Sequence, residues 1–275
     1  MSPRKPSARD TIGHKKRVEE AYDDSAGMYD DTVGRGMASS TNLLLRELQI
    51  PENPTVLDVG CGTGISTFEL MKRVKGRFFG IDISQKMIDL AKERALALGF
   101  SNVEFSKGDA EQLDFPESSF DLIISNLVFH WVQNKQKALK EMLRVLKPRG
   151  QVALLFNAGP HYKEALEIYT RIMNRHPEYP MPDMLKVISL EEAHELFDEA
   201  GFQKTRIFAI HQLNYVDPSI FLLARDATAS WWKIGLPSEV VEMLKKEMLE
   251  EMTKLRTAKG FKSTSYNIIA IAQKP

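Results

Sequence analysis

The sequence contains a single cysteine, Cys61, among 275 residues, so no disulfide can form within the chain. Lysine plus arginine and aspartate plus glutamate both number 37, which leaves no net charge to attract nucleic acid or an anionic membrane. No run of residues reaches the ~20 apolar positions of a membrane span. The opening MSPRKPSARD has no apolar core, so we do not expect a secretory signal. These absences predict a cytoplasmic protein with no nucleic-acid partner.

What the chain does have is an alternation of short apolar runs with helical periodicity. Ser84 is a good helix N-cap, and Pro148 and Gly150 end the helical pattern that precedes them. Alternating strands and helices predict an α/β fold, a Rossmann-like and mostly parallel sheet with its ligand crevice at the carboxyl ends of the strands. The expected strands are 55–59, 77–81, 103–106, 120–125, 151–156, 204–211 and 265–273.

We expect residues 1–12 to be a disordered tail and residues 13–275 to form one domain. Further helical patterns cover 161–174, 189–200, 218–233 and 237–257, and residues 175–188 are interrupted by proline. Since most of these helical segments are inserted between expected strands, they predict a cap over the crevice and not a separate domain. The cap elements lie around 13–50, 157–188 and 212–260.

The stretch VLDVGCGTG places Gly60, Gly62 and Gly64 between an expected strand and an expected helix. Glycines allow a tight turn and let a ligand lie against the backbone. A dinucleotide fingerprint would need a third glycine where Ile65 stands, and a P-loop would need lysine and then serine or threonine after Gly64. The loop is therefore unsuited to phosphate ligands.

Three carboxylates come at or just beyond the expected strand ends: Asp58, Asp82 and Asp109. No lysine or arginine lies at those ends, so the crevice should repel a polyphosphate and attract a cation. Asp82 follows the glycines by about twenty residues, the position from which a carboxylate binds ribose hydroxyls. These features predict a positively charged nucleoside without phosphates, and S-adenosylmethionine fits.

These motifs together resemble the class I S-adenosylmethionine-dependent methyltransferases of the seven-strand Rossmann-like type. Besides VLDVGCGTG, the matching segments are GIDIS (80–84), GDAEQLDFP (108–116), FDLIISNLVFHWV (120–132) and LKPRGQVALL (146–155). The final YNIIAIAQKP resembles the antiparallel seventh strand of that fold. The resemblance implies a seven-stranded sheet whose last strand is antiparallel, and S-adenosylhomocysteine as the product of the cofactor.

The resemblance also implies roles for individual residues at the cofactor. The three glycines pass along the methionine portion, where the Gly60 carbonyl accepts from the cofactor amine and Asp58 supports this end. Asp82 binds the ribose. The residues assigned to the adenine are Ile83 and Met87 on its faces, Asp109 at its amino group and Ala110 at its ring. Asn126 faces the amino-acid end and the substrate.

Two of these residues have structural alternatives, because Met87 also falls on the core face of its helix and Asp109 follows a glycine as turn residues do. Cys61 is expected to be only a small loop residue. None of the histidines shows metal-ligand spacing, so no metal site is expected.

The candidate catalytic residues are His130, as a base or as an anchor for an acceptor carboxylate, and Tyr29, which the resemblance places over the cofactor. His130 could instead merely close the crevice together with Trp131. Arg225 could bind an acidic acceptor or form a surface ion pair. Trp231 and Trp232 are expected to anchor the cap.

The acceptor is expected to be a small molecule methylated on oxygen or carbon. The HW dipeptide and the cap resemble the trans-aconitate and malonyl-carrier-protein O-methyltransferases and the quinone and sterol C-methyltransferases. The alternatives are a catalytically silent cofactor-binding subunit, a methyltransferase for carrier-protein-bound or macromolecular substrates, and an oxidoreductase that binds an anionic nucleotide.

Overall fold

A single seven-stranded sheet organises the computed structural model, which describes residues 8–159, 161–179, 187–226 and 236–275. The strand order is β3-β2-β1-β4-β5-β7-β6, and β7 runs antiparallel to both of its neighbours. This confirms the predicted Rossmann-like sheet and its antiparallel last strand. The strands are β1 (Thr55–Val59), β2 (Arg77–Asp82), β3 (Val103–Lys107), β4 (Phe120–Asn126), β5 (Leu146–Asn157), β6 (Gln203–Val216) and β7 (Phe261–Gln273).

Helices cover both faces of this sheet, because successive side chains along a strand point into two different hydrophobic cores. In β1, for example, Val56 packs with α2 and α3 while Leu57 packs with α4 and α6. The helices are α1 (Ala8–Arg46), α2 (Ile65–Met71), α3 (Gln85–Ala97), the 3-10 turn η1 (Phe129–Trp131), α4 (Lys135–Val145), α5 (Lys163–Met173), α6 (Leu190–Ala200), α7 (Pro218–Asp226) and α8 (Ser238–Lys254).

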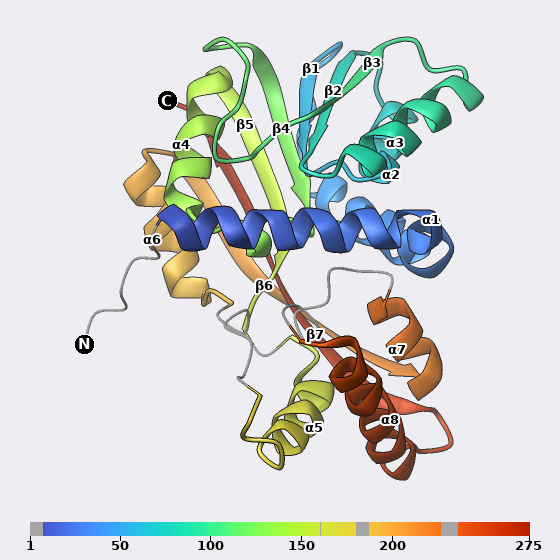
Figure 1. Ribbon diagram of the computed structural model, residues 1–275. Coiled ribbons are helices and arrows are strands. Elements are labelled where there is room, and N and C mark those ends of the chain that lie inside the picture. The colour runs from blue at the N-terminus through green and yellow to red at the C-terminus, as the bar shows by residue number, and fades with distance from the viewer. Residues whose placement is uncertain (1–7, 160, 180–186, 227–235) are drawn as a thin grey trace.

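The helix α1 crosses in front of the sheet, and α5, α7 and α8 gather beyond it at one end of the molecule (Figure 1). These last three helices share a core of their own, centred on the fully buried Tyr169 and Leu244 and closed by Phe261 of β7. We call this unit the cap. It sits between strands in the sequence, as expected from the inserted helical segments.

Several element boundaries differ from those expected. The strand β5 begins at Leu146 and contains Pro148 and Gly150, which sequence reasoning placed after the helix as its stop. Both β6 and β7 are longer than predicted. Residues 8–12, assigned to the tail, are helical, while residues 1–7 lie outside the described part. The predicted helix over 218–233 is observed to Asp226, beyond which residues 227–235 are not described.

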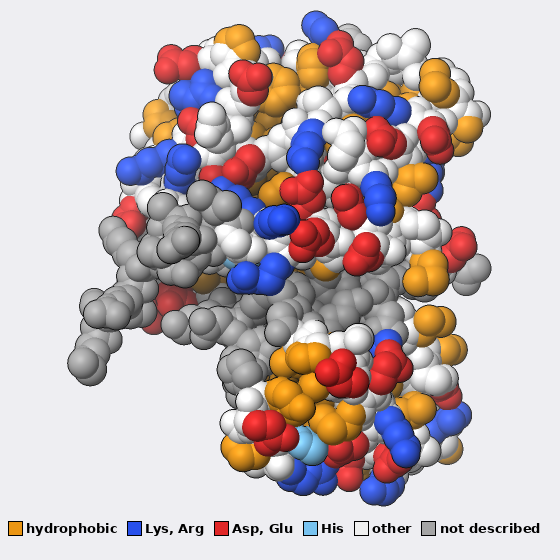
Figure 2. Space-filling view, in the orientation of Figure 1, with side chains coloured by type: hydrophobic (Ala, Val, Ile, Leu, Met, Phe, Trp, Pro, Cys, Tyr) orange, Lys and Arg blue, Asp and Glu red, His pale blue; other side chains and the backbone are white. Residues whose placement is uncertain are grey.

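In the described part of the chain, no helix is both long and apolar enough to cross a membrane. On the face that carries α1, acidic and basic side chains are interspersed and form no continuous field of one sign (Figure 2). The described side chains on this face form no basic stripe of the kind that tracks a nucleic-acid backbone.

Candidate active site

The glycine loop after β1 is a left-handed bend held against the next strand. Gly60, Gly62 and Gly64 all have positive φ angles, of 75°, 53° and 85°. The amides of Gly60 and Cys61 both donate to the Ile81 carbonyl of β2, at 2.7 and 2.9 Å. A methyl group on Gly60 would overlap the Val128 side chain. Only glycine therefore fits this bend without strain.

The strand-end carboxylates Asp82 and Asp58 lie beside this loop. Asp82 accepts from the amides of Gly62 and Ser84, each at 2.9 Å and each on a different oxygen. Asp58, 1% exposed, accepts at Oδ2 from the Thr67 hydroxyl at 2.7 Å, while no described residue hydrogen-bonds its Oδ1. Burial raises the pKa of both carboxyls, that of Asp58 to about 7, and the Asp82 charge adds to the effect on Asp58. A nearby cation would relieve this cost.

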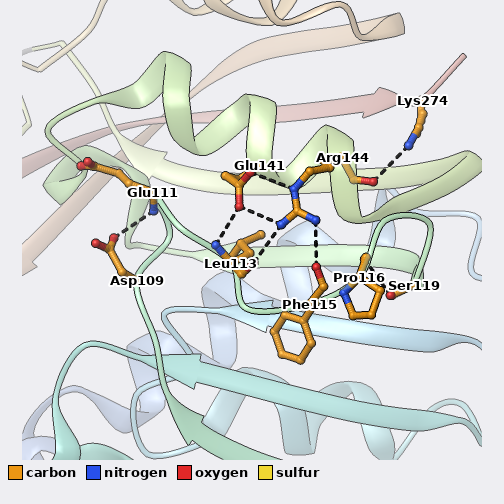
Figure 3. Close-up of polar contacts among 9 residues, drawn as sticks. All are labelled: Asp109, Glu111, Leu113, Phe115, Pro116, Ser119, Glu141, Arg144 and Lys274. Carbon is orange, nitrogen blue, oxygen red and sulfur yellow. Dashed lines mark hydrogen bonds and ion pairs between the residues drawn. The ribbon is translucent and has the colours of Figure 1, made fainter.

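The loop after β3 presents Asp109 and is fixed by α4 (Figure 3). Arg144 donates to the carbonyls of Leu113 and Phe115, both at 2.8 Å, and is itself held by Glu141. Asp109 accepts from the Glu111 amide at 2.9 Å and from Lys15 Nζ at 2.7 Å. The expectation that no lysine or arginine lies at the strand ends was therefore wrong, because Lys107 is the last residue of β3 and Lys15 of α1 reaches Asp109.

The helix α1 is attached to the glycine loop and to α3 by further polar contacts. The Ser84 hydroxyl, which also caps α3 as predicted, donates to Asp23 at 2.5 Å. Asp30 accepts from the Thr63 hydroxyl at 2.6 Å and pairs with Arg94. Together with the Lys15 ion pair, these contacts hold α1 over the carboxyl ends of the strands.

A cavity lies between α1 and these strand ends. Nine predicted residues line it, namely Tyr29, Gly60, Gly62, Asp82, Ile83, Met87, Asp109, Ala110 and Asn126. Asp58 and Gly64 do not line it: the first supports α2 through Thr67, and the second is packed against Phe68. Sequence reasoning missed the other wall residues from α1, which are His14, Lys15, Val18, Tyr22 and Met37. The available signal was the recurrence of His14, Val18 and Tyr22 at intervals of four residues, which Tyr29 and Met37 continue at intervals of seven and eight along one helix face.

His130 does not line this cavity, although Val128 and Trp131 on either side of it do. Its ring lies toward β5, with Nε2 3.4 Å from Asn157 Nδ2. Burial, together with the charges of His161 and Lys135, lowers the pKa of His130 well below its ordinary value. This histidine is thus neutral at physiological pH and is a weak base.

The two aromatic hydroxyls of α1 also stay protonated. Burial raises the pKa of both Tyr22 and Tyr29, and the Asp82 charge adds to it. The Arg225 charge acts on both tyrosines in the opposite sense, and its helix α7 contacts α1. The guanidinium of Arg225 lies over the Tyr162 ring at 4.5 Å. The predicted cap anchors Trp231 and Trp232 lie outside the described residues.

The cavity suits a cationic adenosine derivative. Its wall contains the Asp82 carboxylate and an apolar strip formed by Ile83 and Met87, and the buried carboxyl of Asp58, whose raised pKa a positive ligand would lower, lies behind the glycine loop. The only described lysine in its wall, Lys15, is paired with Asp109 and Glu111. A pyrophosphate would find no unpaired cation there.

Comparisons with known proteins agree with this assignment. Residues 50–201 match a family model described as a methyltransferase domain. The chain belongs to the methyltransferase family. It is 31% identical over 180 residues to the demethylmenaquinone methyltransferase of Staphylococcus aureus, a match that covers 60% of this chain and 74% of the relative. The protein is an S-adenosylmethionine-dependent methyltransferase, as the resemblance in the sequence implied.

Solved structures share the fold across almost the whole methyltransferase chain. A phosphoethanolamine N-methyltransferase of Haemonchus contortus, in complex with S-adenosylmethionine, is similar at 19% identity with a TM-score of 0.64, covering 95% of this chain and 60% of that one. An S-adenosylmethionine-dependent methyltransferase of Aquifex aeolicus is 22% identical with a TM-score of 0.52, covering 86% and 89%. The cyclase SpnF is 19% identical with a TM-score of 0.61, covering 99% and 98%. The last match illustrates that the fold alone does not define the reaction.

Proposed function

We propose that this methyltransferase transfers the methyl group to an oxygen or carbon of a small-molecule acceptor. The observation that carries this proposal is the enclosure of the cavity, because α1 lies across the strand ends and is fastened there by Lys15, Asp23 and Asp30. A folded macromolecule would have to displace this helix to enter the cavity from the side that α1 covers. The similarity to an enzyme named for demethylmenaquinone, a small molecule, supports the same class of acceptor.

The cofactor supplies an activated methyl group on a sulfonium, so the protein's task is alignment and exclusion of water. Asp82 is proposed to hold the ribose hydroxyls on the lone pairs that its two backbone contacts leave available. Asp109 and Ala110 are proposed to bind the adenine edge, and Asn126 the amino-acid end. Asp58 would act indirectly, by placing negative charge behind the glycine loop.

Tyr29 is proposed to cover the cofactor and not to act as a general base. Its side chain is 8% exposed and packs with Tyr22 and Met87, and its raised pKa keeps the hydroxyl protonated. Because Tyr22 also contacts the Trp131 ring edge-on, with the ring centroids 6.2 Å apart, these aromatic side chains form a dry wall beside the methyl group.

The test is incubation of the protein with a metabolite extract and S-adenosylmethionine labelled in its methyl group, followed by identification of labelled products. We expect a labelled small molecule and equimolar S-adenosylhomocysteine. The control is Asp82→Ala, which removes charge-assisted hydrogen bonds worth about 1.5–3 kcal/mol and should lower cofactor affinity at least about tenfold. Label recovered only in protein, or no label despite cofactor binding, would contradict the proposal.

A further inference from the structure

Three neighbouring strands place an asparagine on the same face of the sheet at the edge where the cofactor cavity lies. Asn126 ends β4 and pairs with Leu155 of β5, two residues before Asn157. Asn157 in turn pairs with Asn267 of β7. Because paired residues share a face and residues two apart on a strand do so too, the three side chains form one row across β4, β5 and β7. We call this row the asparagine row.

Every side-chain carbonyl of the asparagine row is buried, and none accepts a hydrogen bond from a described residue. The nitrogen of the Asn126 side chain, in contrast, has partners: Nδ2 donates to the Ser40 and Thr41 hydroxyls, both at 3.0 Å. Asn267 is only 8% exposed. A buried carbonyl without a donor destabilises the fold, and three such groups side by side are unusual. The unpaired carbonyls of the asparagine row lower the stability of the fold, and a ligand that donates hydrogen bonds would pair them.

His130 adds one hydrogen-bond donor to this row. His130 Nε2 lies 3.4 Å from Asn157 Nδ2, and in the tautomer in which Nε2 accepts from this amide the ring proton is on Nδ1. Nδ1 is buried, and no described residue accepts from it. The ring therefore presents an N–H group, and its neutral state is fixed by burial.

We propose that Asn157, Asn267 and the Nδ1–H group of His130 bind the head of the acceptor and select a neutral, hydroxyl-bearing molecule over a carboxylate. The proposal rests on the proposed function and adds the acceptor class. A hydroxyl group both donates and accepts, so it can pair with the carbonyls of the row and with the His130 N–H group. A carboxylate only accepts, so it would leave the carbonyls unpaired and face their partial negative charge.

The position of the row fits this role. Asn126, at one end of it, lines the cofactor cavity, and Val128 and Trp131, on either side of His130, line it as well. A molecule bound at Asn157 and His130 thus lies next to the methyl end of the cofactor site. In this assignment His130 orients the acceptor and is not a general base.

Binding to the protein saturated with S-adenosylhomocysteine tests the proposal without turnover. The probes are 2,3-dihydroxynaphthalene, its dimethoxy analogue, which cannot donate, and 2-naphthoate, measured by calorimetry. We expect the dihydroxy compound to bind at least tenfold more tightly than either of the others. Equal affinities for the three probes would overturn the proposal in favour of an apolar acceptor. Tighter binding of 2-naphthoate that is lost in Arg225→Gln would overturn it in favour of an acidic acceptor.

Variants connect the binding to the row. Asn157→Leu and Asn267→Leu should each weaken the dihydroxy probe at least tenfold. Asn267→Leu should also leave the melting temperature equal or higher, because an unpaired buried carbonyl is replaced by an apolar group, whereas Asn157→Leu also removes the amide that faces His130 Nε2. Asn214→Leu, on the exposed part of β6, is the matched control and should change neither. A lower melting temperature with unchanged probe affinity would show that the row is structural.

His130 is tested by two substitutions. His130→Asn retains an N–H group near the position of Nδ1 and should keep probe affinity within about threefold, with the main change in KM for the natural acceptor once this is known. His130→Phe should lose at least tenfold in affinity. If both variants bind the probe like the parent protein, His130 does not contact the acceptor. Failure of S-adenosylhomocysteine binding itself would instead contradict the proposed function.

Discussion

The cofactor region and the cap are built in different ways. At the cofactor, backbone geometry dominates: three positive-φ glycines form the bend, and backbone amides bind the carbonyl of Ile81 and the carboxylate of Asp82. The cap is held by side-chain packing among α5, α7 and α8, with no member of its core in the cofactor cavity. A short motif can therefore specify the donor site, whereas the acceptor side depends on elements far apart in the sequence.

The largest expected change is a loss of stability when the cap core is disrupted, and it tests whether the cap and the cofactor region are independent. Leu244 is fully buried in the cap core, so Leu244→Ala should cost about 2–5 kcal/mol of unfolding free energy. Since this core does not touch the cofactor cavity, affinity for S-adenosylhomocysteine should stay within about twofold in the folded variant. Chemical denaturation and calorimetry measure the two quantities. A parallel loss of cofactor affinity would mean that the two regions are one cooperative unit at the site.

A smaller effect on stability, with a direct effect on binding, is expected at the glycine loop. Gly60→Ala should lower both the melting temperature and the cofactor affinity, because the methyl group overlaps Val128 and the residue keeps a φ of 75° at a cost of about 1–2 kcal/mol. Gly62→Ala is the matched control for the φ cost alone, since a methyl group there meets no atom within 4 Å. Equal stability losses in the two variants would contradict the overlap at Val128.

The same difference explains how much of the molecule the sequence could predict. The mostly parallel sheet and the cavity residues from the glycine loop were predictable because they belong to local motifs with fixed spacing, and the family resemblance implied the antiparallel β7. The β5 start at Leu146 was not, because Pro148 and Gly150 are ordinarily helix stops and here lie within a strand. The outer half of β6 was also missed, since its exposed positions 211–215 lack the alternation of a half-buried strand.

Contacts between distant segments account for what was missed or misplaced at the site. Lys15 lies 94 residues before Asp109, and only the path of α1 brings them together. His130 was correctly placed near the fourth strand, but its direction depends on Asn157, 27 residues later. Asp58 was expected to support the methionine end, and its hydrogen bond to Thr67 behind the loop could not be read from the sequence. No periodic pattern in the sequence predicts how these side chains are oriented.

The pH dependence of cofactor binding sharpens the comparison further, because no residue of the cap core takes part in it. Burial and Asp82 raise the pKa of Asp58 to about 7, so the folded protein holds a proton that the unfolded chain releases near the ordinary value. Stability of the cofactor-free protein should therefore fall as pH rises from about 4 to about 7. A cationic cofactor favours the carboxylate, so binding should release a proton and tighten as pH rises toward 7.

This dependence can be measured by calorimetry of S-adenosylmethionine binding at pH 5.5 and pH 8, in two buffers of different ionisation enthalpy. Affinity should rise by up to about tenfold per pH unit below the pKa of Asp58 and level off above it. Asp58→Asn should flatten the profile and lose its affinity mainly at pH 8, where the parent carries the charge. A parent protein with equal affinity at both pH values would show that Asp58 keeps one protonation state throughout, and the electrostatic role assigned to the buried carboxyl would then fall to Asp82 alone.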